Sequence, residues 1–129
     1  MSLLLVALLL ALIWFVTARA IVSAQAVTRQ EARVVALNAA EAGIAEAVER
    51  LRQDAWSSSF SGELPRATYS VTFNHGLDAG PWRTVVIEST GKCPAQRLSQ
   101  RVRAMVAVSQ DLSSSEPPMV RLVEWTLVP

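Results

Sequence analysis

The sequence predicts an α+β fold in which one long N-terminal α-helix packs on a small antiparallel β-sheet of three to four strands. Two observations lead to this prediction. Met1 to Ala18 carry no charge, and the chain continues to about Ala55 without proline and without glycine before Gly43. The remainder contains short segments of alternating polar and apolar residues, separated by turn-forming residues, as is typical of antiparallel sheets.

The first part of the helix, residues 1–24, is expected to lie in a membrane or in the core of a filament. Every residue from Leu3 to Val16 is apolar, so this stretch has no polar face. A helix of about 55 residues is roughly 80 Å long, and its apolar third covers roughly 27 Å, close to the hydrocarbon core of a bilayer. The residues predicted to form this core are Leu3, Leu4, Leu5, Val6, Leu8, Leu9, Leu10, Leu12, Ile13, Trp14, Phe15 and Val16.

Residues 25–55 are predicted to form the amphipathic half of the same helix and to pack on the sheet. Apolar residues recur here at spacings of three, four and seven, which is typical of a helix with one buried face. Alanine is frequent between residues 36 and 47; small residues favour helix formation and also let another helix approach closely. The residues predicted to make the helix-to-sheet contact are Val34, Leu37, Ile44, Val48 and Leu51.

Residues 56–129 are predicted to form the sheet and its loops. The expected strands are residues 67–74, 82–90, 97–108 and 119–128. The segments SSSFSGELP, HGLDAGP and 109–118 are rich in serine, glycine and proline, which favours loops and turns. Strands this short, with brief connections, indicate an antiparallel sheet with one face on the helix.

The layout resembles that of processed type IV pilins and pseudopilins. The stretch NAAEAGIAEAVERL (38–51) is similar to the amphipathic half-helix of minor-pilin-like members, and TVVIESTG followed by RVRAMV is similar to their strands. The resemblance implies processing by a prepilin peptidase with Met1 as the processed N-terminus. It also implies partners, namely copies of this chain in a homopolymeric filament, the inner membrane before assembly, and the pilus assembly machinery.

Three features differ from the usual pattern of that family. Mature pilins commonly carry glutamate at the fifth position and proline near position 22, where this chain has Leu5 and Val22. Many also have two C-terminal cysteines, whereas Cys93 is the only cysteine here. Either Met1 is not the mature first residue or the subunit sets its register without the glutamate, as is known for some minor or tip subunits.

Two different cellular locations of the C-terminal part are predicted, each from a different observation. Arg19, Arg29 and Arg33 follow the apolar stretch and no basic residue precedes it, so the positive-inside rule predicts a cytoplasmic C-terminal part. A removed basic leader would reverse this orientation. The resemblance instead implies a precursor in the bacterial inner membrane and then an extracellular filament. A cleaved secretory signal peptide is not favoured, because no basic residue precedes the apolar run.

No constellation typical of an enzyme is present, and we expect no catalytic activity, cofactor, metal or small-molecule substrate. His75 and Asp78 lie in a predicted turn without the further ligands that a metal site needs. Cys93 is expected to be half-buried. The net charge of +1 favours neither a nucleic-acid-binding protein nor one with an acidic tail.

Two surface features remain as minor expectations. A basic stripe, with Arg97, Arg101 and Arg103 outward on one strand and Arg83 beside them, offers a possible but disfavoured contact to DNA phosphates. The serines at 57–59 and 113–115 are candidate O-glycan sites.

The predicted function is that of a structural subunit of a type IV pilus-like extracellular helical filament, which polymerises through its hydrophobic N-terminal helix. Two alternatives stay open. One is a single-span membrane protein that does not polymerise, and the other is a minor pilin or pseudopilin of a secretion or DNA-uptake apparatus.

Overall fold

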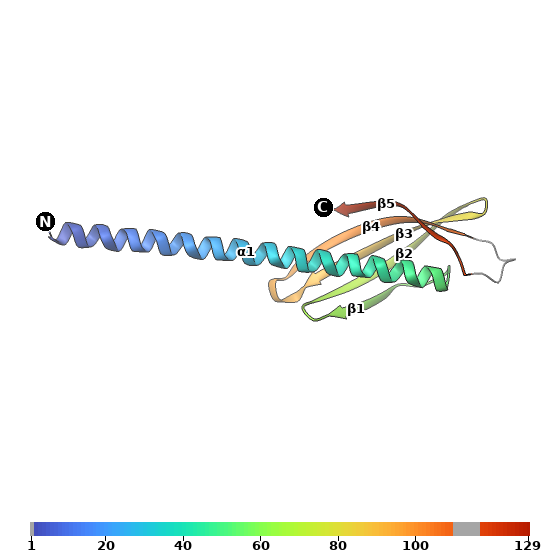
Figure 1. Cartoon of the computed structure of the whole chain (residues 1–129), viewed down its shortest axis with the longest axis horizontal. Coiled ribbons are helices and arrows are strands. Elements are labelled where there is room, and N and C mark those ends of the chain that lie inside the picture. The colour runs from blue at the N-terminus through green and yellow to red at the C-terminus, as the bar shows by residue number, and fades with distance from the viewer. Residues whose placement is uncertain (1, 110–116) are drawn as a thin grey trace. The chain divides into compact units, whose positions relative to one another are not determined.

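The computed structural model describes residues 2–109 and 117–129 and shows the α+β fold that was predicted (Figure 1). The chain forms two compact units, residues 1–31 (unit 1) and residues 32–129 (unit 2). Met1, predicted as the processed N-terminus, and the serines at 113–115 lie outside the described residues. The elements are α1 (Ser2–Gln53), β1 (Phe60–Leu64), β2 (Ala67–Ala79), β3 (Trp82–Cys93), the short 3-10 helix η1 (Pro94–Gln96), β4 (Leu98–Ser109) and β5 (Val120–Val128).

The sheet has five strands in the order β1-β2-β3-β4-β5, each antiparallel to its neighbour. The prediction of three to four strands is therefore corrected to five. The additional strand is β1, which lies in the predicted loop SSSFSGELP and pairs with the start of β2. Its sequence, FSGEL, has serine and glycine in place of β-branched residues, so only its hydrogen bonding to β2 identifies it as a strand.

Strand β2 is longer than predicted and extends through most of the expected turn region. A shift of register between His75 and Asp78 is a bulge, which adds residues to one strand without ending the ladder. The chain reverses only at Gly80 and Pro81, where Gly80 has a φ of 64°. A positive φ at the first position of a two-residue hairpin loop is adopted most readily by glycine.

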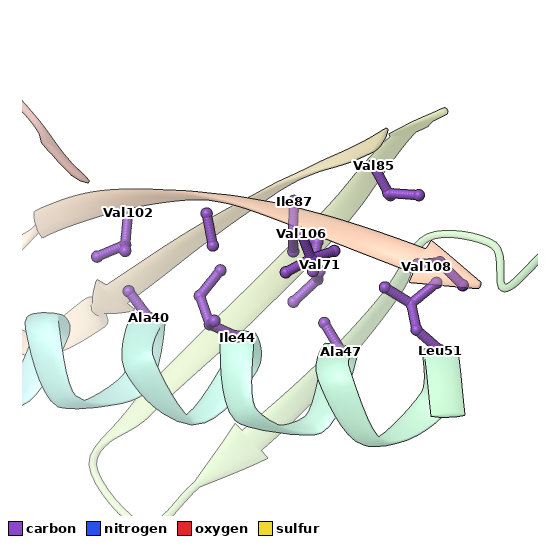
Figure 2. Close-up of a cluster of buried hydrophobic side chains, with 11 residues drawn as sticks. Ala40, Ile44, Ala47, Leu51, Val71, Val85, Ile87, Val102, Val106 and Val108 are labelled. Carbon is purple, nitrogen blue, oxygen red and sulfur yellow. The ribbon is translucent and has the colours of Figure 1, made fainter. Parts of the chain in front are cut away.

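The core of unit 2 lies between one face of α1 and one face of the sheet. Figure 2 shows Ala40, Ile44 and Leu51 pointing from the helix toward strand residues. The buried strand residues are Val71, Val85, Ile87, Val102, Ala104, Val106 and Val108. Each valine, leucine or isoleucine side chain so buried contributes about 1.5–3 kcal/mol, which makes this contact the main source of stability for unit 2.

The helix face that meets the sheet is composed mainly of small residues. Of the predicted contact residues, Ile44 and Leu51 are buried, while Leu37 and Val48 are partly buried against the core. Val34 is 51% exposed, and its predicted contact with the sheet is wrong. At about 100° per residue, Val34 points away from the face that buries its neighbours two positions before and after. The buried residues that define this face are Ala32, Ala36, Ala39, Ala40, Gly43, Ile44, Ala47 and Leu51.

Two glycines bring the helix and the sheet unusually close together. A Cβ atom on Gly91 of β3 would lie 1.9 Å from the carbonyl oxygen of Ala36 and 2.6 Å from the nitrogen of Ala40. A Cβ on Gly43 of α1 would lie 2.2 Å from Ser89 Oγ and 2.9 Å from a methyl carbon of Val71. Backbone therefore meets backbone at Gly91, whereas at Gly43 the helix backbone meets side chains.

We expect Gly43→Ala to destabilise unit 2. Overpacking a core usually costs about 1–3 kcal/mol, and the higher helix propensity of alanine offsets part of this cost. In a Ser89→Ala background the cost should be smaller, because the nearest clashing atom is gone. Ser89→Ala alone should be nearly neutral, since Ser89 Oγ is buried without a hydrogen-bond partner among the described residues. Denaturation followed by tryptophan fluorescence measures all three variants. An equal cost of Gly43→Ala in both backgrounds would contradict the assignment of Ser89 as the limiting contact.

Candidate functional site: an exposed apolar helix

The apolar part of α1 is exposed on all sides. Between Leu3 and Val16 the exposed fraction of the large apolar residues ranges from 49% at Leu9 to 85% at Leu3. Successive residues Leu3, Leu4, Leu5 and Val6 are all exposed, and four consecutive positions cover every side of a helix. Soluble monomers rarely expose a continuous apolar surface of this size, so this surface requires a covering environment.

The same segment is chemically suited to an apolar environment. The α1 helix is long and apolar enough to cross a membrane, a property that signal sequences share. A helix satisfies its own backbone hydrogen bonds, which an apolar surrounding demands. Thr17, the first polar side chain after the apolar run, donates its hydroxyl to the Ile13 carbonyl at 2.8 Å. An exposed apolar helix of this kind suggests membrane association or a signal-like segment.

A polar boundary follows the apolar residues. The Arg19 guanidinium carbon lies 5.8 Å from the centre of the Phe15 ring, a cation–π distance. Trp14 is 76% exposed, as is suitable for an aromatic residue at a membrane interface. Leu5, at the position where pilins usually carry glutamate, is 60% exposed, so the surface near the N-terminal end of α1 carries no side-chain charge among the described residues.

Arg83 of β3 contacts the segment that follows α1 and so links the C-terminal end of the helix to the sheet. This residue was predicted beside the basic stripe of β4, but it is only 1% exposed and lies on the opposite face of the sheet. The prediction was wrong because Arg83 pairs with Val108 in the ladder, and paired residues point to the same side. Its guanidinium donates to the Ala55 carbonyl and lies 3.6 Å from the centre of the Trp56 ring.

His75 joins the same arrangement from β2. Its ring lies 5.3 Å from the Trp56 ring, and its Nε2 is 3.3 Å from the Ser57 carbonyl oxygen. Asp78 lies opposite Arg83 in the β2–β3 ladder. His75 and Asp78 therefore belong to a strand and not to the predicted turn, and His75 contacts the segment that follows α1. Among residues 2–109 and 117–129, no three His, Cys, Asp or Glu side chains form a group that could hold a metal ion.

We expect Arg83→Met to destabilise unit 2 by about 1.5–3 kcal/mol, the range for a hydrogen bond to a charged group. Methionine fills similar space but cannot donate to the Ala55 carbonyl, so the segment at Trp56 should also become looser. Chemical denaturation and the shift of the tryptophan emission, to which Trp56 contributes, measure these effects. Arg101→Met, on the exposed face of β4, is the matched control and should change stability by less than about 0.5 kcal/mol. A variant as stable as the wild type would show that Arg83 does not fasten the helix end.

The predicted basic stripe is present only in part. Arg101 and Arg103 are exposed on the solvent side of β4. Arg97 is also exposed, but it was predicted on the strand and instead precedes it, at the end of η1, with a φ of 51°. Arg103 forms an ion pair with Glu88 on β3 at 2.5 Å, so its charge is partly compensated.

Cys93, expected to be half-buried, is 2% exposed, and its thiol donates to Gln96 Oε1 at 3.0 Å. A buried thiol of this kind packs as a small apolar residue.

A polar cluster links the middle of the helix to β2. The Tyr69 hydroxyl donates to Glu46 Oε2, and Arg50 donates to Glu46 Oε1 at 2.9 Å. The guanidinium of Arg50 also lies 3.9 Å from the centre of the Phe60 ring. The bond from Tyr69, assisted by Arg50, lowers the pKa of the Glu46 carboxyl, and the same bond raises the pKa of the Tyr69 hydroxyl.

This cluster predicts a dependence of stability on acid. A carboxyl with a lowered pKa in the folded state contributes stability above its usual pKa of 4.5, and that contribution disappears as the pH falls through the folded value. Glu46→Gln should therefore lose less free energy of unfolding on acidification than the wild type, although glutamine still accepts from Tyr69. The control is Glu49→Gln. The Glu49 carboxylate is exposed and lies 3.6 Å from Arg52, and its replacement should leave the wild-type dependence of stability on pH unchanged. Identical profiles for both variants would contradict the role of Glu46.

One apolar surface was not identified from the sequence. On β5, Leu122, Trp125 and Leu127 face the same side as the core but are 56%, 45% and 46% exposed. They were missed because a register shift between Met105 and Val106 of β4 interrupts the alternation along β5.

The chain has a pilin-like architecture, with a long apolar N-terminal helix and, within unit 2, helix packed on an antiparallel sheet. No protein-family model, no curated protein and no solved structure matches it.

Proposed function

We propose that this chain is a structural subunit of a type IV pilus-like helical filament. In this proposal the N-terminal helices of many copies bundle in the core, and unit 2 of each copy forms the outer surface. The supporting observation is the exposure of the apolar residues from Leu3 to Val16 on every side of the helix. A helix that is apolar all round must be buried in lipid or among other chains.

Assembly would exchange one apolar environment for another. Leaving lipid for a bundle of similar helices changes the hydrophobic term little, so close van der Waals packing must supply much of the stability. A subunit surrounded by neighbours gains such contacts on several sides. Leu5 in place of glutamate means that this packing would proceed without a charge at that position, which favours a minor or tip subunit within the same class.

The proposal includes a location and a set of partners. The chain would wait in the bacterial inner membrane and then enter an extracellular filament, with copies of itself and the assembly machinery as partners. Enzymatic activity, a cofactor and a small-molecule substrate have no place in this role. DNA contact is not part of the proposal, because the ion pair of Arg103 with Glu88 weakens the basic stripe and no aromatic residues interleave with it.

Electron microscopy of filaments sheared from cells that produce the full-length chain tests the proposal. We expect a chain trace, or an antibody against unit 2, to locate the subunit along the filament. Labelling at one end alone would support a tip subunit instead of a main component. Isolated copies in the membrane with unit 2 on the cytosolic side, and no filament containing the chain, would overturn the proposal.

A second candidate is a single-span membrane protein that does not polymerise. It is favoured by Arg19, Arg29 and Arg33, which follow the apolar stretch and would place unit 2 in the cytoplasm. Protease treatment of intact spheroplasts distinguishes the two. Digestion of unit 2 from outside is expected for the filament subunit, and protection is expected for the second candidate.

A further inference from the structure

Both edges of the sheet are open. In the part of the chain that the structure describes, β1 pairs only with β2 and β5 pairs only with β4. An open edge presents unpaired backbone N–H and C=O groups that can extend the sheet with another strand. β5 contains no proline between Val120 and Val128, so every residue that faces the open edge has a backbone N–H that can donate a hydrogen bond.

From these edges we infer that neighbouring copies of this chain join their sheets, with the β5 edge of one copy pairing in parallel with the β1 edge of the next. This inference rests on the proposed function, because it names a contact between subunits of the filament. It concerns unit 2 alone, and it is separate from the bundling of the apolar helices.

The direction of the strands favours this pairing. Because the sheet has five strands and every neighbouring pair is antiparallel, β1 and β5 run in the same direction. A copy displaced sideways without being turned therefore presents β1 parallel to β5, with the helix-covered faces on the same side. Such a contact is heterologous and can repeat without limit. Antiparallel pairing of two β5 edges would instead reverse one copy and stop at a dimer.

Charge complementarity favours a second copy as the occupant. Glu63 on β1 and Arg121 on β5 both lie on the solvent side of the sheet. When these two are placed side by side, a carboxylate and a guanidinium face each other across the proposed contact. Neither of the two charges has an ion-pair partner among the described residues. An opposite-sign pair would therefore form between copies, and this pair favours the stated register over others.

The apolar sides match in the same register. Leu64 of β1 comes level with Leu122 of β5, and both lie on the helix-covered side while being 40% and 56% exposed. Joining the edges would bury them against each other and bring them close to Trp125. The ladder is short because β1 ends at Leu64 and Pro65 has no N–H to donate. A short ladder gives a weak contact, and repetition along a filament supplies its strength.

Cysteine cross-linking of the full-length chain tests the inference. In a Cys93→Ala background, Leu64→Cys and Leu122→Cys are combined, and filaments or membranes containing the chain are treated with a short thiol cross-linker. We expect a ladder of dimers, trimers and longer species on a denaturing gel. The control combines Leu64→Cys with Lys92→Cys, an exposed position on the central strand β3, and should give no ladder.

A charge exchange makes the test specific. Adding Arg121→Glu to the double-cysteine variant should abolish the series of cross-linked species on the gel, and adding Glu63→Arg as well should restore this series. Dimers that form with Leu122→Cys alone and do not grow would indicate antiparallel β5 pairing and overturn the inference. Filaments that contain the chain but give no more cross-linking than the control would overturn the inference and leave the proposed function intact. Absence of any assembled copies would overturn both.

Discussion

Gly91→Ala is expected to destabilise unit 2 by about 3 kcal/mol or more, at the upper end of the cost of overpacking. The added Cβ would lie 1.9 Å from the Ala36 carbonyl oxygen and 2.6 Å from the Ala40 nitrogen. Both atoms belong to the helix backbone, so no change of rotamer can relieve the overlap. The helix must move away from β3. This movement would separate Ile44 and Leu51 of the helix from the sheet and open the core.

The measurement is denaturation of the full-length chain in detergent, followed by the fluorescence of Trp56, Trp82 and Trp125. Lys92→Ala, at the next position and on the opposite face of the sheet, is the matched control and should change stability by less than about 0.5 kcal/mol. Gly91→Ala also differs from Gly43→Ala, because a smaller side chain at the facing position cannot rescue it. Wild-type stability of Gly91→Ala would show that the helix does not approach the sheet as closely as described.

Leu9→Arg is expected to abolish both membrane retention and incorporation into filaments. Leu9 lies within the apolar run, and a charge at the centre of a bilayer costs about 2.5–3.5 kcal/mol on insertion scales. In a bundle of helices the same charge would be surrounded by leucine side chains with no partner, because no charged residue precedes Arg19. The variant should be found in neither the membrane fraction nor sheared filaments, while unit 2 keeps its fluorescence and its stability.

Val34→Arg is the control for this second prediction. It introduces the same charge on the same helix, but Val34 is 51% exposed in unit 2, outside the apolar run. Membrane retention should remain as in the wild type. If filaments with Leu9→Arg form normally, the apolar run is not their core, and the proposed function would need another assembly surface.

Several features of the fold were predictable because they depend on local sequence. The uncharged run before Arg19 and the absence of proline determine a continuous helix, and the alternation in TYSVTF determines a strand. The apolar surface of unit 1 was also predictable, since fourteen consecutive apolar residues from Leu3 to Val16 leave no polar face. These predictions required only the geometry of a helix and of a strand.

Other features depended on contacts that no local pattern reveals. The apolar side chain of Val34 predicts a place in the core, yet the sheet packs on the helix face with the alanines and Gly43, where the backbones can meet. Arg83 was placed on the surface because it is charged, yet its cross-strand pairing turns it inward onto Trp56. Strand β1 was missed because FSGEL has no strand preference of its own, and pairing with β2 creates it.

The sequence by itself determined that the chain has a helix that is apolar all round at its start and an α+β unit after it. Hydrophobicity and periodicity are properties of neighbouring residues, and they suffice for that conclusion. Only the tertiary structure decided which helix face is buried, where Gly91 lets backbone touch backbone, and that, among the described residues, both sheet edges stay open with opposite charges at Glu63 and Arg121. These depend on residues far apart in the chain, whose meeting is set by packing and by strand register.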